Sequence, residues 1–547
     1  MATMEAHHTQ IDNLWVVALA SKLLPLPPGN IAILLAALFL TSLGLSLAYW
    51  LHPGGPAWGR TRAARGCWVK NKPIPGPRGL PFIGSMDLMT GLAHHKLARA
   101  ACRNGARRLM ALSLGETRVI VTCHPDVARE ILNSSHFADR PVKESAYSLL
   151  FNRAIGFAPY GTYWRTLRRI AATHLFCPRQ IMGSEARRRE LAAQMTSAIS
   201  GFGSEGFRPR EVLKRASLNS MMSSVFGRDY DLVKGSNDEV EELKGMVEEG
   251  YDLLGQLNLS DHVPWIAALD PQKIRFRCSR LVPRVNQFVG RIIDEHRNQK
   301  KMKMKKKSQL DFVDVLLSLE GPDQLAETDM IAVLWEMIFR GTDTVAVLIE
   351  WILARMVVHP QVQSRVQEEL DGVVGRSRPV LESDLPALVY LTAVVKEVLR
   401  MHPPGPLLSW ARLAITDTKV DGHYIPAGTT AMVNMWAITR DPEVWADPES
   451  FMPKRFLPEE GGAEVSVYGS DLRLAPFGSG RRVCPGKALG ITTATHWVAH
   501  LLHEFEWLPA GQDDPVDLGE VLRLSSEMAE ALAVKVRPRL IRDTRAI

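Results

Sequence analysis

The sequence predicts a mainly α-helical protein with small β-sheets, folded as a single large domain behind an N-terminal transmembrane helix. Twenty uncharged, mostly apolar residues run without interruption from position 31 to 50, about the length needed to span a bilayer core. Beyond residue 84 the chain has no internal repeat and no composition shift that would mark a second domain. Its 547 residues, 46% of them hydrophobic, are enough to bury a large core.

The apolar run and its flanks predict the topology of the N-terminal region. Glu5 and Asp12 precede the run, whereas a secretory signal has a basic start, so we expect an uncleaved anchor with a cleaved signal peptide as the alternative. Before the run Lys22 is the one basic side chain, and five follow it, at positions 60, 62, 65, 70 and 72. The positive-inside rule therefore predicts a lumenal segment at 1–30, the anchor at 31–50, a basic and proline-rich linker at 51–84 and a cytosolic domain at 85–547.

The remaining elements are helices with two small β regions. Four prolines between residues 72 and 84 forbid a helix in the linker and favour an extended tether. Leu109–Leu114 and Val119–Thr122 flank a Gly-Glu turn and predict a β-hairpin. The longest helical pattern runs from Thr328 to Val358, about 45 Å, and ends just before His-Pro. A second β region is expected around residues 420–431.

Cysteine usage and charge exclude two classes of protein. The six cysteines form no close pairs and no Cys-x-x-Cys, which argues against a disulfide framework and indicates a reducing compartment. The formal net charge of +7 is modest, and its densest part is six lysines within residues 300–307, interrupted by methionines and not by aromatics. This run predicts a solvated loop and no nucleic-acid partner.

The segment Pro476–Gly486, Pro-Phe-Gly-Ser-Gly-Arg-Arg-Val-Cys-Pro-Gly, presents Cys484 as a metal-binding thiolate. Gly478 and Gly480 allow the backbone to approach a flat ligand closely. Pro485 suits the first position of a helix that continues over residues 487–502, and a helix N-terminus favours an anionic sulfur. A lone thiolate without a second Cys or His ligand is typical of an axial ligand on a macrocycle and not of a zinc site.

This pattern closely resembles the haem-binding loop of the cytochrome P450 family. The resemblance implies a cytochrome P450-type fold, with residues 85–547 as a haem-thiolate monooxygenase domain. It implies haem b (iron protoporphyrin IX) as the cofactor and Cys484 as the axial ligand of the haem iron. The loop residues that bind the cofactor by this resemblance are Phe477, Gly480, Arg482, Cys484 and Gly486.

Arginines that would pair with the two haem propionates also occur in the family's order. Trp164-Arg-Thr-Leu-Arg168 matches the Trp-x-x-x-Arg motif of the helix that faces the haem, so Trp164 and Arg168 are implied to bind the cofactor. Arg412 falls where a further propionate partner usually lies. Arginine suits this task because it pairs with carboxylates in a bidentate manner and keeps its charge when buried.

The middle of the long predicted helix carries Gly341-Thr342-Asp343-Thr344 within an apolar stretch. A polar pair in such a stretch is costly unless it is satisfied or used, and a stripe facing solvent is the alternative. The oxygen-binding helix of the P450 family carries Gly-x-Asp-Thr at its centre. The resemblance therefore implies that Thr344 positions dioxygen and that Asp343 relays protons toward it.

Arg340 departs from the family pattern, which has a small residue at this position. One explanation is an ion pair with Glu336 one turn earlier, in the favourable Glu-before-Arg order. The other is that Arg340 reaches the substrate pocket and anchors a carboxylate of the substrate. The sequence leaves both explanations open.

Glu397 and Arg400 lie three residues apart on a helical pattern, which by itself predicts a surface ion pair. Glu-x-x-Arg ahead of the cysteine loop is, however, a P450 signature, and the stretch 451–456 supplies its usual partner, Arg455. The resemblance implies a buried network of Glu397, Arg400 and Arg455 that fixes the loop behind the haem.

The chain has no convincing flavin or nicotinamide motif of its own. Residues 201–206 fit the pattern G-x-G-x-x-G, but a helical pattern precedes them where a strand is required. The resemblance implies that electrons come from NADPH through a separate NADPH–cytochrome P450 reductase in the endoplasmic reticulum membrane. Arg481 and Lys487 are candidates for its docking surface.

Three stretches, 339–344, 404–412 and 433–438, resemble the plant seventy-eight A subfamily. This implies a plant microsomal enzyme that hydroxylates fatty-acid-like, hydrophobic substrates and acts in organ growth and development, with a pocket lined by parts of 145–160, 406–409 and 525–529. Two rivals stay open: an oxygen-independent haem-thiolate isomerase or dehydratase, against which Asp343 and Thr344 argue, and a membrane-tethered haem-binding protein that is not an enzyme.

Overall fold

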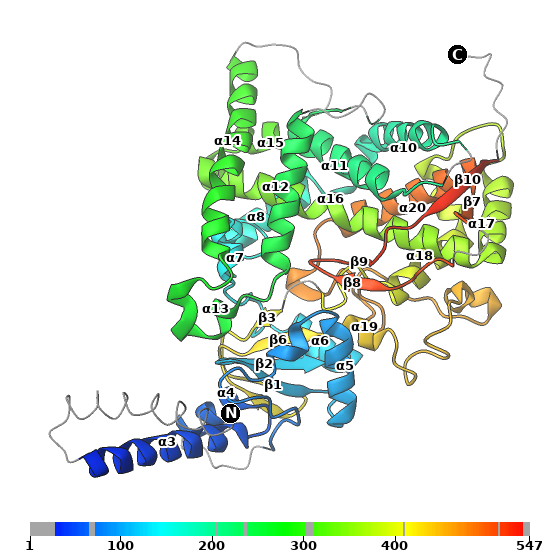
Figure 1. Cartoon of the computed structure of the whole chain (residues 1–547). Helices are drawn as coiled ribbons and strands as arrows, with labels where there is room; N and C mark the ends of the chain where they lie inside the picture. Colours follow the sequence, from blue (N-terminus) through cyan, green and yellow to red (C-terminus); the bar gives the residue numbers. More distant parts are fainter. Residues whose placement is uncertain are drawn as a thin grey trace, which may run out of the picture.

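The computed structural model describes residues 28–64, 72–203, 206–230, 232, 238–301, 310–408, 411–511 and 515–539. Most of the expected lumenal segment (1–27), part of the linker (65–71) and most of the lysine run (302–309) lie outside the described residues. The described part is mainly helical with four small sheets, which confirms the predicted fold class (Figure 1).

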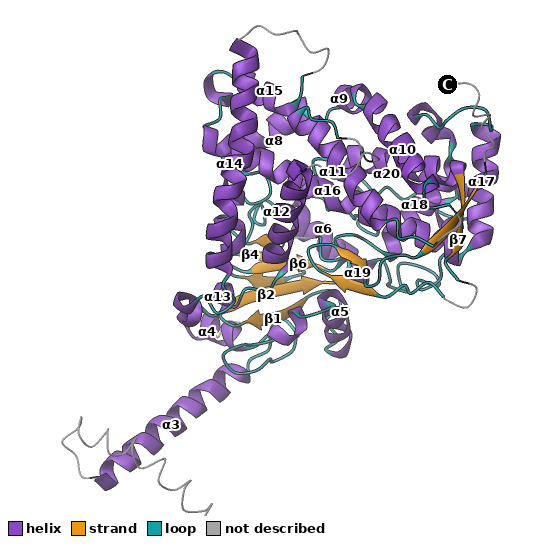
Figure 2. Ribbon diagram, turned by 45° about the horizontal axis from the view of Figure 1, so that its top comes forward, coloured by secondary structure: helices purple, strands orange, loops and turns teal. Residues whose placement is uncertain are grey.

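The apolar run forms helix α3 (Pro28–Trp50), which projects from the body of the protein (Figure 2). Its stretch from Asn30 to Ala48 has a mean hydropathy of 2.4 and is almost entirely exposed. A short helix that the sequence did not predict, α4 (Pro56–Ala64), follows it. The buried Trp58 of α4 donates its indole N–H to the carbonyl oxygen of Leu112 at 2.8 Å, which holds α4 against the first strand.

The proline-rich segment is extended, as predicted, but it docks on the body instead of running free. Ala111 donates its backbone N–H to the carbonyl oxygen of Pro75 at 2.9 Å, and Ile74 is buried. Both α4 and the proline-rich segment are therefore held against β1.

The largest sheet has the strand order β1-β2-β6-β3, with β2 and β6 parallel and the other two pairs antiparallel. The predicted hairpin is present, and the second predicted β region contains β4, β5 and β6. The strands are β1 (Met110–Leu114), β2 (Thr117–Thr122), β3 (Arg412–Leu413), β4 (Thr418–Val420), β5 (His423–Ile425), β6 (Thr430–Val433), β7 (Phe505–Pro509), β8 (Glu520–Leu522), β9 (Ser526–Met528) and β10 (Val534–Pro538).

Most of the helices after α4 form the larger, upper part of the body in Figure 1, while α5, α6, α13 and α19 lie lower, near the largest sheet. The helices after α4 are α5 (Ala93–Arg103), α6 (Pro125–Asn133), α7 (Glu144–Ser148), α8 (Thr162–His174), α9 (Pro178–Gly183), α10 (Glu185–Ser200), α11 (Arg210–Phe226), α12 (Asp238–Gly255), α13 (Leu259–His262), α14 (Ile274–Lys301), α15 (Phe312–Ser318), α16 (Glu327–Val358), α17 (Pro360–Val373), α18 (Val389–Met401), α19 (Met435–Ile438) and α20 (Lys487–Glu504).

Helix α16 is the long helix that the sequence predicts, and it positions the candidate site. Its N-terminal half packs in one large apolar cluster and its C-terminal half in another, so it crosses the core. At Gly341 an added Cβ would lie 2.5 Å from the sulfur of Met221, and this glycine therefore lets α11 pack closely against α16. Helix α20 begins at Lys487 with Gly486 as its N-cap, so the expectation that Pro485 opens the helix was wrong by two residues.

Candidate active site

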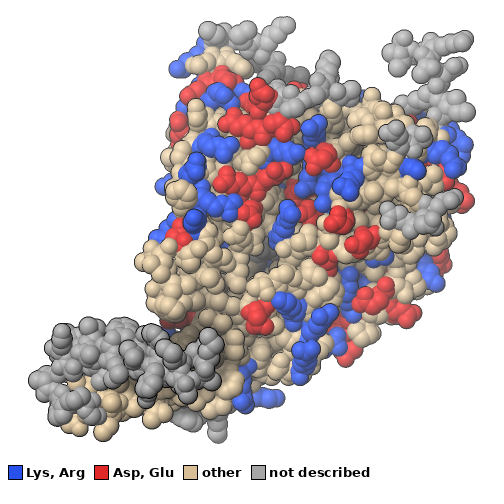
Figure 3. Space-filling model, viewed as in Figure 1, with Lys and Arg blue, Asp and Glu red and all other residues tan. Residues whose placement is uncertain are grey.

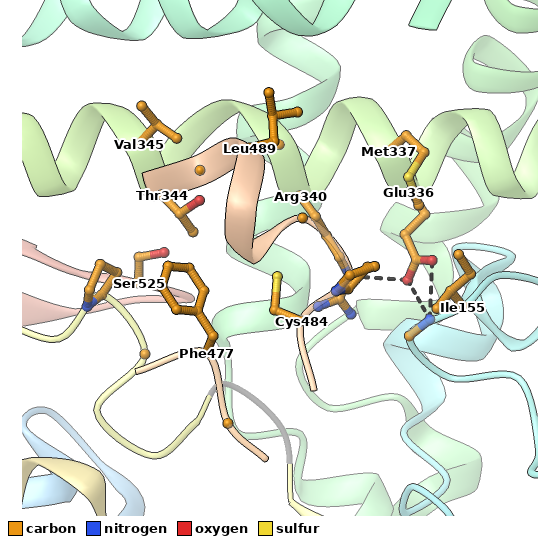
Figure 4. A pocket seen from close by; sticks show the side chains of 18 of the residues that line it. Ile155, Glu336, Met337, Arg340, Thr344, Val345, Phe477, Cys484, Leu489 and Ser525 are labelled. Carbon is orange, nitrogen blue, oxygen red and sulfur yellow. Dashed lines mark hydrogen bonds and ion pairs between the residues drawn. The ribbon is translucent and has the colours of Figure 1, made fainter. Parts of the chain in front are cut away.

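Cys484 lies in the wall of a cavity between α16 and the loop 476–486 (Figure 4). Its sulfur points toward α16, from which Thr344 projects into the same space, and Phe477 and Leu489 line the cavity beside it. The loop is closed by a hydrogen bond from the backbone N–H of Cys484 to the carbonyl oxygen of Phe477 at 3.0 Å. The predicted metal ligand and the predicted oxygen-binding threonine thus face one enclosed volume.

The two loop glycines have different reasons to be glycine. Both adopt a positive φ, 71° at Gly478 and 67° at Gly480, which disfavours other residues. Gly478 lines the cavity, as does Gly486, whereas a Cβ on Gly480 would collide with the carbonyl oxygen of Leu132. A glycine is therefore needed at position 480 because the loop passes close to the end of α6, and the expected approach to a flat ligand is not the reason for this glycine.

The environment of Cys484 does not by itself produce a thiolate. Burial raises the pKa of the Cys484 thiol, and this outweighs the opposing effects of the Gly486 N–H and of nearby Arg168 and Arg340. The Gly486 N–H at the helix N-terminus does favour the anionic sulfur, as expected, but burial has the larger effect. A metal ion bound at Cys484 would supply the missing positive charge, because a metal-bound thiol loses its proton outright.

Buried and half-buried arginines gather around this cavity. Arg168 of α8 donates to the carbonyl oxygen of Val483 at 2.6 Å, and Arg412 donates to that of Ser479 at 3.2 Å. Arg482 donates to the carbonyl oxygens of Ala138, Ile155 and Ala158, and its guanidinium lies 4.4 Å from the ring centre of Trp164. Arg168, Arg482 and Trp164 line the cavity, whereas Arg412 is buried behind it.

Sequence reasoning missed one member of this group, Arg140. It lines the cavity and donates to the carbonyl oxygens of Gly156 at 3.3 Å and Ala411 at 3.1 Å. A single arginine in a loop carries no spacing pattern, so the sequence offered no signal that would separate it from the other arginines of the chain.

The arginines disfavour one another's charge. Burial, together with Arg482 and Arg168, lowers the pKa of Arg412 to about 9, and burial is also the main reason that the pKa of Arg482 falls to about 10. The pKa of Arg140 is lowered by burial and by Arg412, Arg482 and Arg340. Clustered positive charge of this kind calls for an anionic ligand. A haem, with two propionates for the arginines and an iron for Cys484, fits this set of side chains.

Arg340 forms the ion pair that the sequence offered as one explanation, and its position at the cavity leaves the other explanation, a substrate anchor, as a prediction. Its Nε lies 3.1 Å from Oε1 of Glu336, which also accepts the N–H of Gly156 at 2.9 Å, so the ion pair within α16 exists. Arg340 also lines the cavity, and Figure 4 shows it extending from α16 toward the Cys484 side. The guanidinium is therefore held by Glu336 while a face of it remains in the cavity.

Asp343 and Thr344 point in different directions. Thr344 lines the cavity that contains Cys484. Asp343 lines a second cavity, where its Oδ1 lies 3.3 Å from Nζ of Lys214, and the same ammonium lies 3.6 Å from Oε2 of Glu527. Burial raises the pKa of Asp343, although Lys214 acts in the opposite direction. Ser525 and Tyr251 line both cavities, so the two spaces adjoin.

The structure brings Glu397, Arg400 and Arg455 together in a buried cluster. Both carboxylate oxygens of Glu397 accept from Arg400, at 2.8 and 2.9 Å, and Oε1 also accepts from Nε of Arg455 at 3.1 Å. Glu397 and Arg400 have fully buried side chains. The remaining N–H groups of the two arginines donate to backbone carbonyls between residues 439 and 450.

The rest of the cavity wall is largely apolar. All three predicted segments contribute to it, through Ile155 and Gly156, through Leu408, and through Ser525, while Ser409 lies outside the described residues. Helices α11 and α16 add a group of apolar side chains: Met221, Met337, Val345 and Leu348.

Comparison with known proteins finds one family, close relatives in plants and a solved structure of the same fold. The model of the family "Cytochrome P450" matches residues 74–528. Cytochrome P450 78A9 of Arabidopsis thaliana is 64% identical over 96% of this chain and 97% of its own length, and cytochrome P450 78A3 of Glycine max is 62% identical over 96% and 98%. A solved zebra fish cytochrome P450 with progesterone superposes with a TM-score of 0.69 at 27% identity, covering 82% of this chain and 99% of that one.

Proposed function

The chain belongs to the cytochrome P450 family and is a P450 monooxygenase, and from this premise we propose that it hydroxylates a fatty-acid-like substrate with electrons that NADPH supplies through a separate reductase. The observation that carries the proposal is the shared cavity of Cys484 and Thr344, whose surroundings combine clustered arginines with apolar side chains. When haem b is bound, its thiolate-ligated iron activates dioxygen.

We assign the cofactor-holding roles to the residues around the cavity. Cys484 provides the sulfur ligand. The two propionates pair with Arg140, Arg168, Arg412 and Arg482. The guanidinium of Arg482 lies over the ring of Trp164, which supports it. Glu397, Arg400 and Arg455 hold the segment 439–452 in place through hydrogen bonds to its backbone. These residues bind and orient, and they take no part in proton transfer.

Asp343 and Thr344 form the proposed proton path. Thr344 presents a hydroxyl group at the cavity, where the reacting oxygen must receive protons. Asp343 takes protons from the second cavity, and its raised pKa makes a buried carboxyl group that can both accept and release a proton. The ion pair with Lys214 keeps Asp343 turned toward that second cavity between proton transfers.

Arg340 is the proposed anchor for a substrate carboxylate. Its guanidinium reaches the cavity, whose wall also carries apolar side chains of α16 such as Met337 and Val345, and Glu336 fixes its position. A fatty acid offers the matching combination of one carboxylate and a long apolar chain. A charge-assisted hydrogen bond of this kind contributes about 1.5–3 kcal/mol to binding.

The proposed setting is the endoplasmic reticulum membrane, with α3 as a single-pass anchor and the catalytic domain in the cytosol. The exposed, apolar α3 supports the anchor. On the face seen in Figure 3, Lys and Arg side chains are mixed with Asp and Glu over the body, which is unlike a nucleic-acid-binding surface. A role in plant organ growth and development is proposed from the likeness to the 78A relatives.

Reconstitution with NADPH–cytochrome P450 reductase tests the proposed function. We expect hydroxylated product from a medium-chain fatty acid only when NADPH, reductase and dioxygen are all present. Turnover without NADPH would favour an isomerase or dehydratase. A normal thiolate-type spectrum without NADPH consumption, across a panel of fatty acids, would contradict the proposed substrate class.

A further inference from the structure

Two histidines and a glutamate converge where the start of α5 meets the β8–β9 hairpin. Nε2 of His94 lies 3.1 Å, and Nε2 of His95 lies 2.6 Å, from the same oxygen, Oε1 of Glu520. The side chain of His94 is fully buried, while those of His95 and Glu520 are 24% and 11% exposed. One ligand atom from each residue lies within 4.8 Å of the other two.

We propose that His94, His95 and Glu520 form a zinc site that fastens α5 to the β8–β9 hairpin. Imidazole nitrogen and carboxylate oxygen are regular zinc ligands, and bonds of about 2.0–2.2 Å place tetrahedral ligand atoms about 3.3 Å apart. His94 and Glu520 already have nearly this spacing, and the partly exposed His95 needs only a small outward movement. Two nitrogens and one oxygen leave the fourth position for water.

Neighbouring groups orient the three ligands. The second carboxylate oxygen of Glu520 accepts a hydrogen bond from Oγ of Ser526 at 2.6 Å, which leaves Oε1 directed at the histidines. The ring of His95 stacks on Trp436 with ring centres 4.0 Å apart. Such supporting contacts are typical of metal sites, where they fix the orientation of the ligands.

The position of the proposed zinc site connects it with the active-site cavity through the β8–β9 hairpin. Leu524 and Ser525, in the turn between β8 and β9, line the cavity that contains Cys484. Zinc held by Glu520 fixes the base of this hairpin to α5 and so restricts movement of that part of the cavity wall. Zinc is thus expected to slow the exchange of bound molecules without touching the cofactor ligands.

Equilibrium dialysis against low-micromolar zinc tests the proposal, with full-length, haem-loaded protein purified without a histidine tag and zinc counted by mass spectrometry. We expect one zinc per chain in the wild type. His95→Ala and Glu520→Gln are each expected to weaken binding by at least about tenfold. His423→Ala is the matched control, because His423 is a histidine outside the cluster, bonded to a backbone carbonyl, and it is expected to keep wild-type binding.

Thermal unfolding gives a second readout that does not depend on catalysis. Zinc should raise the unfolding midpoint of the wild type and of His423→Ala, and should leave that of Glu520→Gln unchanged. The reduced carbon monoxide spectrum checks that each variant retains its haem. A wild type that binds no zinc would overturn the proposal, as would zinc bound with equal affinity after both His95→Ala and Glu520→Gln.

Discussion

The molecule holds two separate arginine clusters, and they differ in the charge that balances them. In the cluster of Glu397, Arg400 and Arg455, a carboxylate and backbone carbonyls of the chain itself receive the arginine N–H groups. In the cluster around Cys484, backbone carbonyls and the carboxylate of Asp139 also accept from the arginines, but burial and the other arginines lower the pKa of Arg140 and Arg412. The first cluster has a fully buried carboxylate at its centre, whereas the second has an excess of positive charge that suits an anionic ligand.

This difference separates a structural network from a binding site without reference to any motif. Removal of a residue from the first cluster should destabilise the protein, because it leaves a buried charge without its partner. Removal of an arginine from the second cluster should relieve repulsion in the haem-free protein and weaken cofactor binding. The expected changes in stability thus have opposite signs.

The largest effect is expected for Glu397→Ala. The fully buried Arg400 loses its carboxylate, which should cost about 3–5 kcal/mol in the free energy of unfolding and yield protein without haem. Urea unfolding and the haem content of purified protein measure this. Glu327→Ala, which breaks the surface pair with Arg297, is the control and should cost less than about 1 kcal/mol. Normal haem incorporation in Glu397→Ala would refute the assignment of this network.

Asp343→Asn tests a third group of charged side chains, in which Lys214 lies between the carboxylates of Asp343 and Glu527. Asparagine keeps the size of the side chain but cannot carry the proton, so product formation should fall about 100-fold while haem binding is unchanged. NADPH consumption should fall less than product formation, because reduced oxygen escapes as peroxide. The product formed per NADPH is the measurement.

Asp252→Asn serves as the control for this prediction, because Asp252 lines the same second cavity but does not adjoin Thr344. It should leave the product yield per NADPH close to that of the wild type. Equal yields in Asp343→Asn and the wild type would remove Asp343 from the proton path.

Arg412→Gln addresses the second cluster directly. It should speed haem transfer to apomyoglobin about tenfold or more, since one charge-assisted hydrogen bond is lost. The haem-free protein should be no less stable than the wild type, because Arg412 and Arg482 no longer repel each other. Arg108→Gln, at a surface pair with Asp421, controls for the loss of an arginine. A less stable haem-free Arg412→Gln would show that both clusters are structural.

The smallest effect is expected for Arg340→Ala. Affinity for a fatty acid should fall about tenfold, and affinity for its methyl ester should stay within about twofold, as judged from the shift of the haem absorption on binding. Met337→Ala, in the wall of the same cavity, should weaken the binding of both ligands equally, because this substitution removes apolar contact only. If Arg340→Ala loses equal affinity for the acid and the ester, Arg340 does not anchor a carboxylate and only its ion pair with Glu336 remains.

Much of the site was predictable because its residues occur in motifs with fixed spacing. The loop around Cys484, the pair Glu397 and Arg400, and the long helix each appear where the sequence placed them. Arg140 was not predictable, since its place in the cluster depends on how a loop folds over Gly156 and Ala411. Helix α4 was missed for a related reason, because burial of Trp58 against β1 holds it and its local sequence does not.

The directions of Asp343 and Thr344 illustrate what a motif omits. Successive residues on an α-helix point about 100° apart, and here this turn separates the two side chains: Thr344 lines the cavity that contains Cys484, whereas Asp343 lines the second cavity. Their shared motif predicts a joint function but not that Asp343 faces Lys214 and a second cavity. Gly480 is a similar case, since its conformation and the carbonyl of Leu132 require the glycine.

The measurement that tests the central claim most directly is the reduced carbon monoxide spectrum of Cys484→Ser. If the cavity is a haem site with Cys484 as the sulfur ligand, this variant should lose the thiolate-type spectrum. Cys123→Ser, at a buried cysteine in a different apolar cluster, should keep it. A thiolate-type spectrum that survives in Cys484→Ser would contradict the assignment of this cavity as the active site.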